Sequence, residues 1–150
     1  MFVLLRQLDR LRQTAHLDRG DRRRSLAIRH VDAGSCNGCE HELALTNSPV
    51  YDLARFGLDL VASPRHADIL LVTGPVTTRM ATALRTAYDA MPEPRLVAAL
   101  GDCALGCNVL GEPAEHVGSL EAVLPVEIRI PGCPPAPEAI AEYLLAGLDR

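Results

Sequence analysis

The sequence contains no tryptophan and no lysine, and it has few aromatic residues of any kind. Phenylalanine, tyrosine and tryptophan together make up 3% of the 150 residues, so the hydrophobic core must be built from aliphatic side chains. All 15 basic residues are arginine. No stretch approaches the roughly 18 apolar residues that a membrane-spanning helix requires. The 150 residues are enough for one domain with a substantial core.

Charge is divided unevenly along the chain. Residues 1–25 hold seven arginines against three aspartates, a net charge of +4, and the remainder holds eight arginines against sixteen acidic residues, a net charge of −8. Leu4, Leu8, Leu11 and Ala15 recur at helical spacing, which predicts a helix over residues 2–17. We therefore expect residues 1–25 to be a basic docking helix and linker, followed by a domain over residues 26–150. The acidic, aromatic-poor domain speaks against nucleic-acid binding.

The beginning of the sequence lacks the features of a secretory signal. Arg6, Asp9, Arg10 and Arg12 interrupt any apolar segment there. We therefore expect the chain to stay in the cytoplasm. In that reducing compartment, five cysteines indicate metal binding or redox chemistry rather than structural disulfides.

The hydrophobic pattern alternates between strands and helices. Strands are predicted over residues 26–32, 58–62, 68–73, 96–100 and 126–130, and helices over residues 40–46, 77–90 and 137–148. Pro137 suits the first turn of the last helix. This alternation predicts an α/β domain with a parallel sheet and helices on both faces.

Four cysteines follow predicted strands. Cys36 and Cys39 stand in a C-x-x-C pair after the first strand, Cys103 follows the strand over 96–100, and Cys133 follows the last strand. Because the carboxyl ends of parallel strands share one edge of the sheet, we expect these four thiols to meet there. Such a set suits a metal site.

The residue types around these cysteines favour an iron–sulfur cluster. A 4Fe-4S cluster takes four cysteine ligands, and glycines such as Gly34 and Gly38 leave backbone N–H groups free to face sulfur. Zinc remains an alternative, although structural zinc usually binds two close pairs, whereas Cys103 and Cys133 are isolated. A thioredoxin-like redox pair is a third interpretation, but it leaves those two cysteines without a role.

Five motifs in order resemble the cluster-bearing small subunit, of the 20 kDa type, that complex I (NADH:quinone oxidoreductase) shares with energy-converting nickel–iron hydrogenases. They are Asp32-Ala33-Gly34-Ser35-Cys36-Asn37-Gly38-Cys39, Val72-Thr73-Gly74-Pro75-Val76-Thr77, Met91-Pro92-Glu93-Pro94-Arg95, Gly101-Asp102-Cys103-Ala104 and Ile130-Pro131-Gly132-Cys133-Pro134-Pro135. The separated C-x-x-C pair resembles the hydrogenase branch, and the formate-hydrogenlyase type in particular. Complex I usually has two adjacent cysteines at this position.

The resemblance implies a flavodoxin-like fold with one 4Fe-4S cluster at the carboxyl edge of the strands, ligated by Cys36, Cys39, Cys103 and Cys133. It implies an electron-transfer subunit of a membrane-associated hydrogenase-like or quinone oxidoreductase complex. The expected partners are a large catalytic, hydrogenase-like subunit, a ferredoxin-like subunit and membrane-arm subunits. They would hold the chain at the cytoplasmic face of the inner membrane. The alternative from another class is a zinc-stabilised structural or assembly subunit without a redox role.

Other residues near the cysteines carry weaker signals. Glu42 matches a family position, and it is either a redox-linked proton site or a residue packed at a subunit interface. Cys107 replaces a glycine usual in the family. We expect it to fill a tight spot as a small apolar side chain rather than to serve as an alternative ligand. The loop after residue 73 resembles a phosphate cradle at a helix N-terminus. No residue has the features of a nucleophile or a general base, so we expect no complete active site in this chain.

Overall fold

The structure, a computed structural model, describes residues 25–107 and 115–148. The helix predicted over residues 2–17 and its linker lie outside the described residues. None of the helices in the described ranges is both long enough and apolar enough to cross a bilayer.

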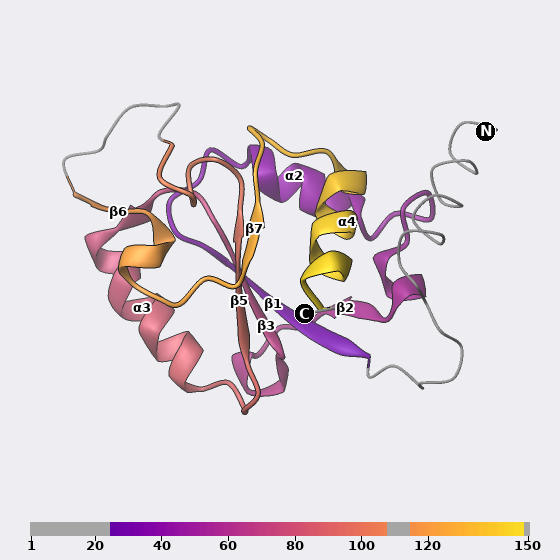
Figure 1. Ribbon diagram of the computed structural model, residues 1–150, viewed down its shortest axis with the longest axis horizontal. Helices are drawn as coiled ribbons and strands as arrows, with labels where there is room; N and C mark the ends of the chain where they lie inside the picture. Colours follow the sequence, from indigo (N-terminus) through magenta and orange to yellow (C-terminus); the bar gives the residue numbers. More distant parts are fainter. Residues whose placement is uncertain (1–24, 108–114, 149–150) are drawn as a thin grey trace.

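A five-stranded sheet with all pairs parallel forms the centre of the domain (Figure 1). Its strand order is β2-β1-β3-β5-β7, the flavodoxin-like order, so the prediction of a flavodoxin-like α/β fold is confirmed. The strands are β1 (Leu26–Asp32), β2 (Leu58–Leu60), β3 (Ile69–Thr73), β5 (Leu96–Leu100) and β7 (Ile128–Ile130).

Helices cover both faces of this sheet (Figure 1). The helices α2 (Gly38–Leu45) and α4 (Pro137–Leu148) lie on one face, and α3 (Thr78–Asp89) lies on the other. Alternate residues of the central strand β3 enter the two cores: Ile69 and Leu71 pack toward α2 and α4, and Leu70 and Val72 pack with the α3 side. Burial on both faces explains why β3 is apolar from Ile69 to Val72, and its last residue, Thr73, is buried as well.

The helices and strands follow the sequence prediction closely. The α2 helix begins at Gly38 rather than residue 40. The β2 strand ends at Leu60 rather than residue 62, because a 3-10 helix begins at Pro64. The β7 strand begins at Ile128 rather than residue 126. A small antiparallel sheet of β4 (Val76–Thr77) and β6 (His116–Gly118) was not predicted, since segments of two and three residues carry no periodicity.

The sheet brings distant parts of the sequence to a common edge. The strands β1, β5 and β7 run parallel, and each is followed directly by one of the cysteine-bearing loops. The loops therefore gather at the carboxyl edge of the sheet, which is the upper edge in Figure 1. The central strand β3 ends at the same edge, between β1 and β5, in a loop without cysteine.

Candidate metal centre

The four predicted thiols come together at the carboxyl edge. The Cys39 thiol is half-buried, and its pKa is raised to about 12. Burial is the main cause, followed by the negative charge of Glu40 and then by the charges of Cys103, Cys36 and Cys133. Because such electrostatic effects weaken with distance, Cys39 must lie near all three of the other thiols.

Backbone contacts link the same loops independently. A Cβ atom added to Gly101, two residues before Cys103, would lie 2.5 Å from Sγ of Cys39. A Cβ atom added to Gly38 would lie 3.5 Å from Sγ of Cys36 and 3.8 Å from the ring of Pro134. The absence of a side chain at Gly101 is thus what leaves room for the Cys39 sulfur. The first cysteine loop touches both of the others.

The thiols differ in exposure. Cys39 and Cys103 are half-buried, whereas Cys36 and Cys133 are exposed. Cys107 is also exposed, so the prediction that it fills a tight spot as a small buried side chain is wrong. The chain turns outward at Gly106, whose φ is +93°, and the Cys107 N–H donates to the Asp102 carbonyl. Cys107 is not among the thiols whose charge raises the pKa of Cys39.

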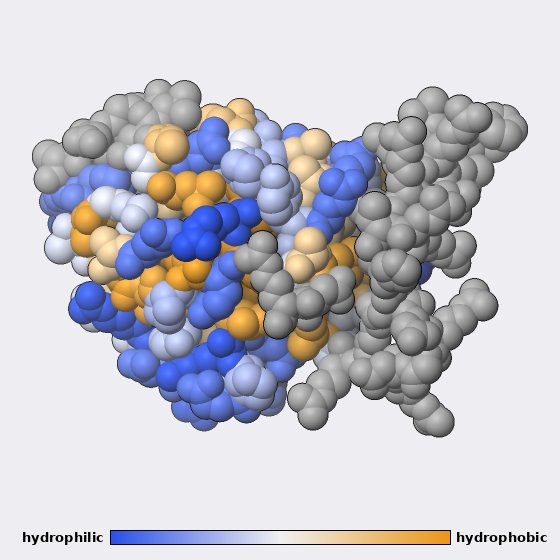
Figure 2. All heavy atoms as spheres, in the orientation of Figure 1, coloured by the Kyte–Doolittle hydropathy of each residue, from blue (hydrophilic) through white to orange (hydrophobic). Residues whose placement is uncertain are grey.

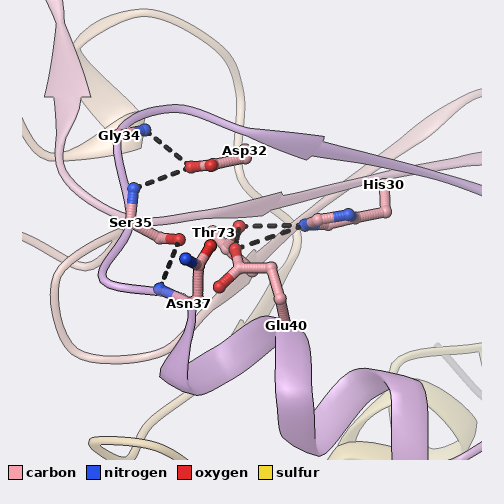
Figure 3. Close-up of polar contacts among 7 residues, drawn as sticks. All are labelled: His30, Asp32, Gly34, Ser35, Asn37, Glu40 and Thr73. Atoms are coloured by element: carbon pink, nitrogen blue, oxygen red, sulfur yellow. Dashed lines mark hydrogen bonds and ion pairs between the residues drawn. The ribbon is translucent and has the colours of Figure 1, made fainter.

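An aspartate holds the loop that carries Cys36 (Figure 3). Oδ1 of Asp32 accepts hydrogen bonds from the N–H groups of Gly34 (2.8 Å) and Ser35 (2.7 Å). Oγ of Ser35 in turn accepts from the N–H of Asn37 (3.1 Å), which adopts the left-handed conformation at the start of α2. Short polar side chains thereby satisfy the loop amides and fix the course of the backbone between β1 and α2.

The loop after β3 packs against the first cysteine loop. Gly74 has φ +79°, and a Cβ atom there would lie 2.5 Å from the backbone nitrogen of Ser35. The N–H of Ala33 donates to the Thr73 carbonyl at 2.9 Å. At the end of this loop, Oγ1 of Thr77 accepts from the N–H of Met80 and caps α3. The motif that resembled a phosphate cradle in sequence therefore packs against the cysteine loop.

A second aspartate joins the loops of Cys103 and Cys133. The N–H of Asp102 donates to the carbonyl of Gly132 (2.9 Å), and the N–H of Gly132 donates to Oδ1 of Asp102 (2.7 Å). Beside this pair, the N–H of Gly101 donates to the carbonyl of Ile130 (2.8 Å). The two isolated cysteines are therefore fixed relative to each other by reciprocal hydrogen bonds.

A buried polar group next to Cys39 was not predicted from the sequence. Glu40 turns from the first turn of α2 toward β1 and β3, where Oε1 accepts a hydrogen bond from the hydroxyl of Thr73 (Figure 3). Nε2 of His30 lies 2.9 Å from that hydroxyl and 3.7 Å from Oε1 of Glu40. Burial lowers the pKa of His30, although the Glu40 carboxylate opposes this shift. Thr73 itself is fully buried.

Glu42 lies on the side of α2 that approaches α4. It is half-buried, and its charge helps to raise the pKa of Tyr51, after burial of the phenol and the charge and hydrogen bond of Glu138 at the start of α4. His41 is exposed. Tyr51 and Glu138 are therefore neighbours of Glu42. Both interpretations of Glu42, a redox-linked proton site or a residue packed at a subunit interface, stay predictions.

The donor set suits a group that needs four thiolates. Two half-buried and two exposed sulfurs lie on three loops that are anchored by Asp32 and Asp102, and glycine leaves the space beside Cys39 open. Within residues 25–107 and 115–148, no three His, Cys, Asp or Glu side chains form a group that could hold a single metal ion. The residues that could hold a metal or cluster are Cys36, Cys39, Cys103 and Cys133.

Comparison with known proteins identifies the family. Residues 36–147 match the family described as NADH ubiquinone oxidoreductase, 20 Kd subunit. The chain is 45% identical over 127 residues to the probable membrane-bound hydrogenase subunit mbhJ of Pyrococcus furiosus, covering 85% of this chain and 76% of that protein. It is 42% identical over 117 residues to formate hydrogenlyase subunit 7 of Escherichia coli, covering 78% of this chain and 46% of that one.

Similarity to solved structures is in line with this family. The chain is similar to a subunit of the membrane-bound sulfane sulfur reductase, an archaeal respiratory membrane complex, with a TM-score of 0.70, 32% identity, and coverage of 83% of this chain and 71% of that one. An NAD+-reducing [NiFe]-hydrogenase shares the fold, with a TM-score of 0.63, 22% identity, and coverage of 83% and 93%. The resemblance seen in the motifs is thus confirmed, and the chain belongs to the family of the 20 kDa subunit of NADH:ubiquinone oxidoreductase, which includes subunits of membrane-bound hydrogenases.

Proposed function

We propose that this chain is an electron-transfer subunit that carries one 4Fe-4S cluster, ligated by Cys36, Cys39, Cys103 and Cys133. The observation that carries the proposal is the meeting of the cysteine loops at the carboxyl edge of the sheet. Gly101 leaves room there for the Cys39 sulfur, and reciprocal hydrogen bonds join the loops of Cys103 and Cys133. Family membership supports it, since the relatives are subunits of oxidoreductase complexes. When bound, such a cluster takes up and releases single electrons.

The chain's own residues have distinct tasks in this proposal. The four thiols supply the ligands, and they must lose their protons to do so. Asp32 and Asp102 keep the three loops in position through backbone amides. Burial of Cys39 and Cys103 reduces contact with water, whereas Cys36 and Cys133 face outward, where a partner subunit would complete the surroundings.

The proposed partners are a large catalytic, hydrogenase-like subunit, a ferredoxin-like subunit that delivers electrons, and membrane-arm subunits. The names of the relatives support this, since they refer to a membrane-bound hydrogenase, a formate hydrogenlyase and a respiratory membrane complex. Large apolar side chains are exposed on the described surface, among them Leu45, Val50 and Tyr143, and Figure 2 shows hydrophobic residues reaching one face among hydrophilic ones. The location that follows is the cytoplasmic face of the inner membrane, held through these partners.

The terminal acceptor in this proposal is set by the large subunit. Hydrogen chemistry needs a nickel–iron site, and two C-x-x-C pairs in the neighbouring large subunit would supply its thiolates. A large subunit without these pairs would direct the electrons to quinone or to another acceptor. This chain serves as the electron relay in either case.

The test is the metal content of the chain purified anaerobically together with its large subunit. About four iron and four acid-labile sulfide per chain are expected. The same preparation tests the alternative, a zinc-stabilised structural or assembly subunit. Zinc in place of iron, or a folded complex without metal, would contradict the electron-transfer proposal.

A further inference from the structure

Glu40, Thr73 and His30 form a polar group inside a largely apolar part of the molecule. The three residues come from α2, β3 and β1, and 43 residues separate His30 from Thr73 in the sequence. The Glu40 side chain is 20% exposed and turns toward the sheet rather than toward solvent (Figure 3). A glutamate whose only role was to interact with the positive end of the α2 helix dipole could do so from the surface. Its inward position needs another explanation.

The partners of Glu40 leave its negative charge largely uncompensated. Oε1 accepts from the Thr73 hydroxyl, which is neutral. Oε2 is buried and has no hydrogen-bond partner among the described residues. Among the described residues, the basic side chain that pairs with Glu40 is His30, and burial lowers its pKa, which favours the neutral ring at neutral pH. A buried polar atom without a partner costs free energy, so natural proteins keep few of them and often for a functional reason.

The charge of Glu40 acts on the candidate cluster site. Glu40 follows Cys39 directly in the sequence, and among charged groups it has the largest effect on the Cys39 thiol, ahead of the other three cysteines. The Thr73 hydroxyl holds the carboxylate on this side of α2, and His30 in turn holds Thr73. The Glu40 side chain is therefore held in a fixed position on the residue that directly follows one of the four cysteines.

We propose that Glu40, held by Thr73 and His30, is a positioning residue that lowers the reduction potential of the cluster. This inference presupposes the cluster of the proposed function. A cluster held by the four thiolates would gain one negative charge on accepting one electron from a reduced ferredoxin-like subunit, and the nearby carboxylate would oppose that gain. In the partly buried site the repulsion is screened less than it would be in water. Thr73 and His30 act through Glu40, because they fix its orientation.

The test compares midpoint potentials, measured by an EPR-monitored redox titration of the chain in complex with its large subunit. Glu40→Gln keeps the size of the side chain and removes the charge, so the potential should shift upward. Glu40→Asp keeps the charge close to Cys39 and should recover most of the original potential. Glu142→Gln removes an equal charge from the exposed surface of α4 and should leave the potential unchanged.

Each outcome separates this inference from the proposed function. A wild-type complex without iron would contradict the proposed function itself. A loaded Glu40→Gln variant with the wild-type potential would overturn the inference and leave the proposed function standing. An Asp variant that shifts as far as the Gln variant would also overturn it. Loss of the cluster from both variants would assign Glu40 to assembly and reject a role in setting the potential.

Discussion

At both edges of the sheet, carboxylates accept hydrogen bonds from backbone N–H groups, but only the carboxyl edge carries the four candidate cysteines. At the amino edge, Asp68 accepts the N–H of Ala27 and Glu127 accepts the N–H of Val97, each at 2.8 Å. At the carboxyl edge, Asp32 and Asp102 accept loop amides at 2.7–2.8 Å. Carboxylates thus satisfy backbone donors at both edges.

The difference lies in the space around the glycines. Gly57 at the amino edge and Gly101 at the carboxyl edge both have positive φ values, +81° and +89°. A Cβ atom on Gly57 would find its nearest neighbour at 3.9 Å, whereas one on Gly101 would lie 2.5 Å from the Cys39 sulfur. The amino edge needs glycine only for its backbone conformation. The carboxyl edge also needs glycine to leave room for sulfur.

Removal of a ligand should have the largest effect on the carboxyl edge. Serine at Cys36, Cys39, Cys103 or Cys133 should remove most of the iron, because a 4Fe-4S cluster requires four thiolates. Cys107→Ser is the matched control, since Cys107 is exposed and is not among the thiols whose charge raises the pKa of Cys39. Iron analysis of the five variants decides the point. Loss of iron from the Cys107 variant alone would refute the assignment of ligands.

Replacing Gly57 and Gly101 by alanine should separate two effects, the strain of a positive φ and the loss of room for the Cys39 sulfur. Gly57→Ala should lower the free energy of unfolding by about 1–2 kcal/mol, because it places alanine at positive φ. Gly101→Ala should lower it further, because its Cβ would also lie 2.5 Å from the Cys39 sulfur. Only Gly101→Ala should also displace the Cys39 sulfur and lower the iron content. Denaturant unfolding and iron analysis measure the two effects. Equal iron content in both variants would argue against a close fit at Gly101.

Burial should make Cys39 slow to react in the metal-free chain. A pKa of about 12, against an ordinary value of 9.0, lowers the thiolate fraction at pH 8 about a thousandfold. A more basic thiolate is also more nucleophilic, which restores part of the lost reaction rate. Alkylation of Cys39 should therefore be roughly 30–100-fold slower than alkylation of an ordinary thiol. The rate should rise with pH up to the pKa, because the shift favours the protonated form. Mass spectrometry of iodoacetamide-treated protein, with exposed Cys107 as the reference, measures it; equal rates would contradict the burial of Cys39.

Removal of one carboxylate from each edge should have the smallest effects on the iron content. Asp68→Ala and Asp102→Ala should each cost about 1–3 kcal/mol of stability, since each leaves a backbone N–H without its acceptor. Asp102→Ala should in addition loosen the Cys133 loop and speed loss of iron to a chelator. If Asp68→Ala speeds this loss equally, the effect follows from general stability and the comparison of the edges fails.

Much of the fold could be predicted from the sequence because apolar runs have clear boundaries. The bounds of β1, β5 and α4 agree with the predicted ranges, and the gathering of the four thiols followed from parallel strands sharing an edge. The agreement is poorest where segments are short. The β4–β6 pair has too few residues to form a pattern, and its partners are distant in sequence.

The polar group around Glu40 could not be predicted, for a different reason. A glutamate in the first turn of a helix usually faces solvent, and nothing local signals that this one turns inward to Thr73, 33 residues away. The exposure of Cys107 was not predicted either; this residue follows Gly106, whose φ is +93°, and its N–H donates to the Asp102 carbonyl. Motifs pointed to the four candidate ligands, whereas the residues that position these cysteines depend on contacts between distant parts of the chain.

Low-temperature EPR of the dithionite-reduced chain, purified anaerobically with its large subunit, tests the central claim most directly. The account predicts a spin one-half signal that integrates to about one spin per chain, that is lost in Cys39→Ser and that persists in Cys107→Ser. A complex that is folded and assembled but gives no signal before or after reduction would contradict the claim that this edge of the sheet carries an electron-transfer cluster.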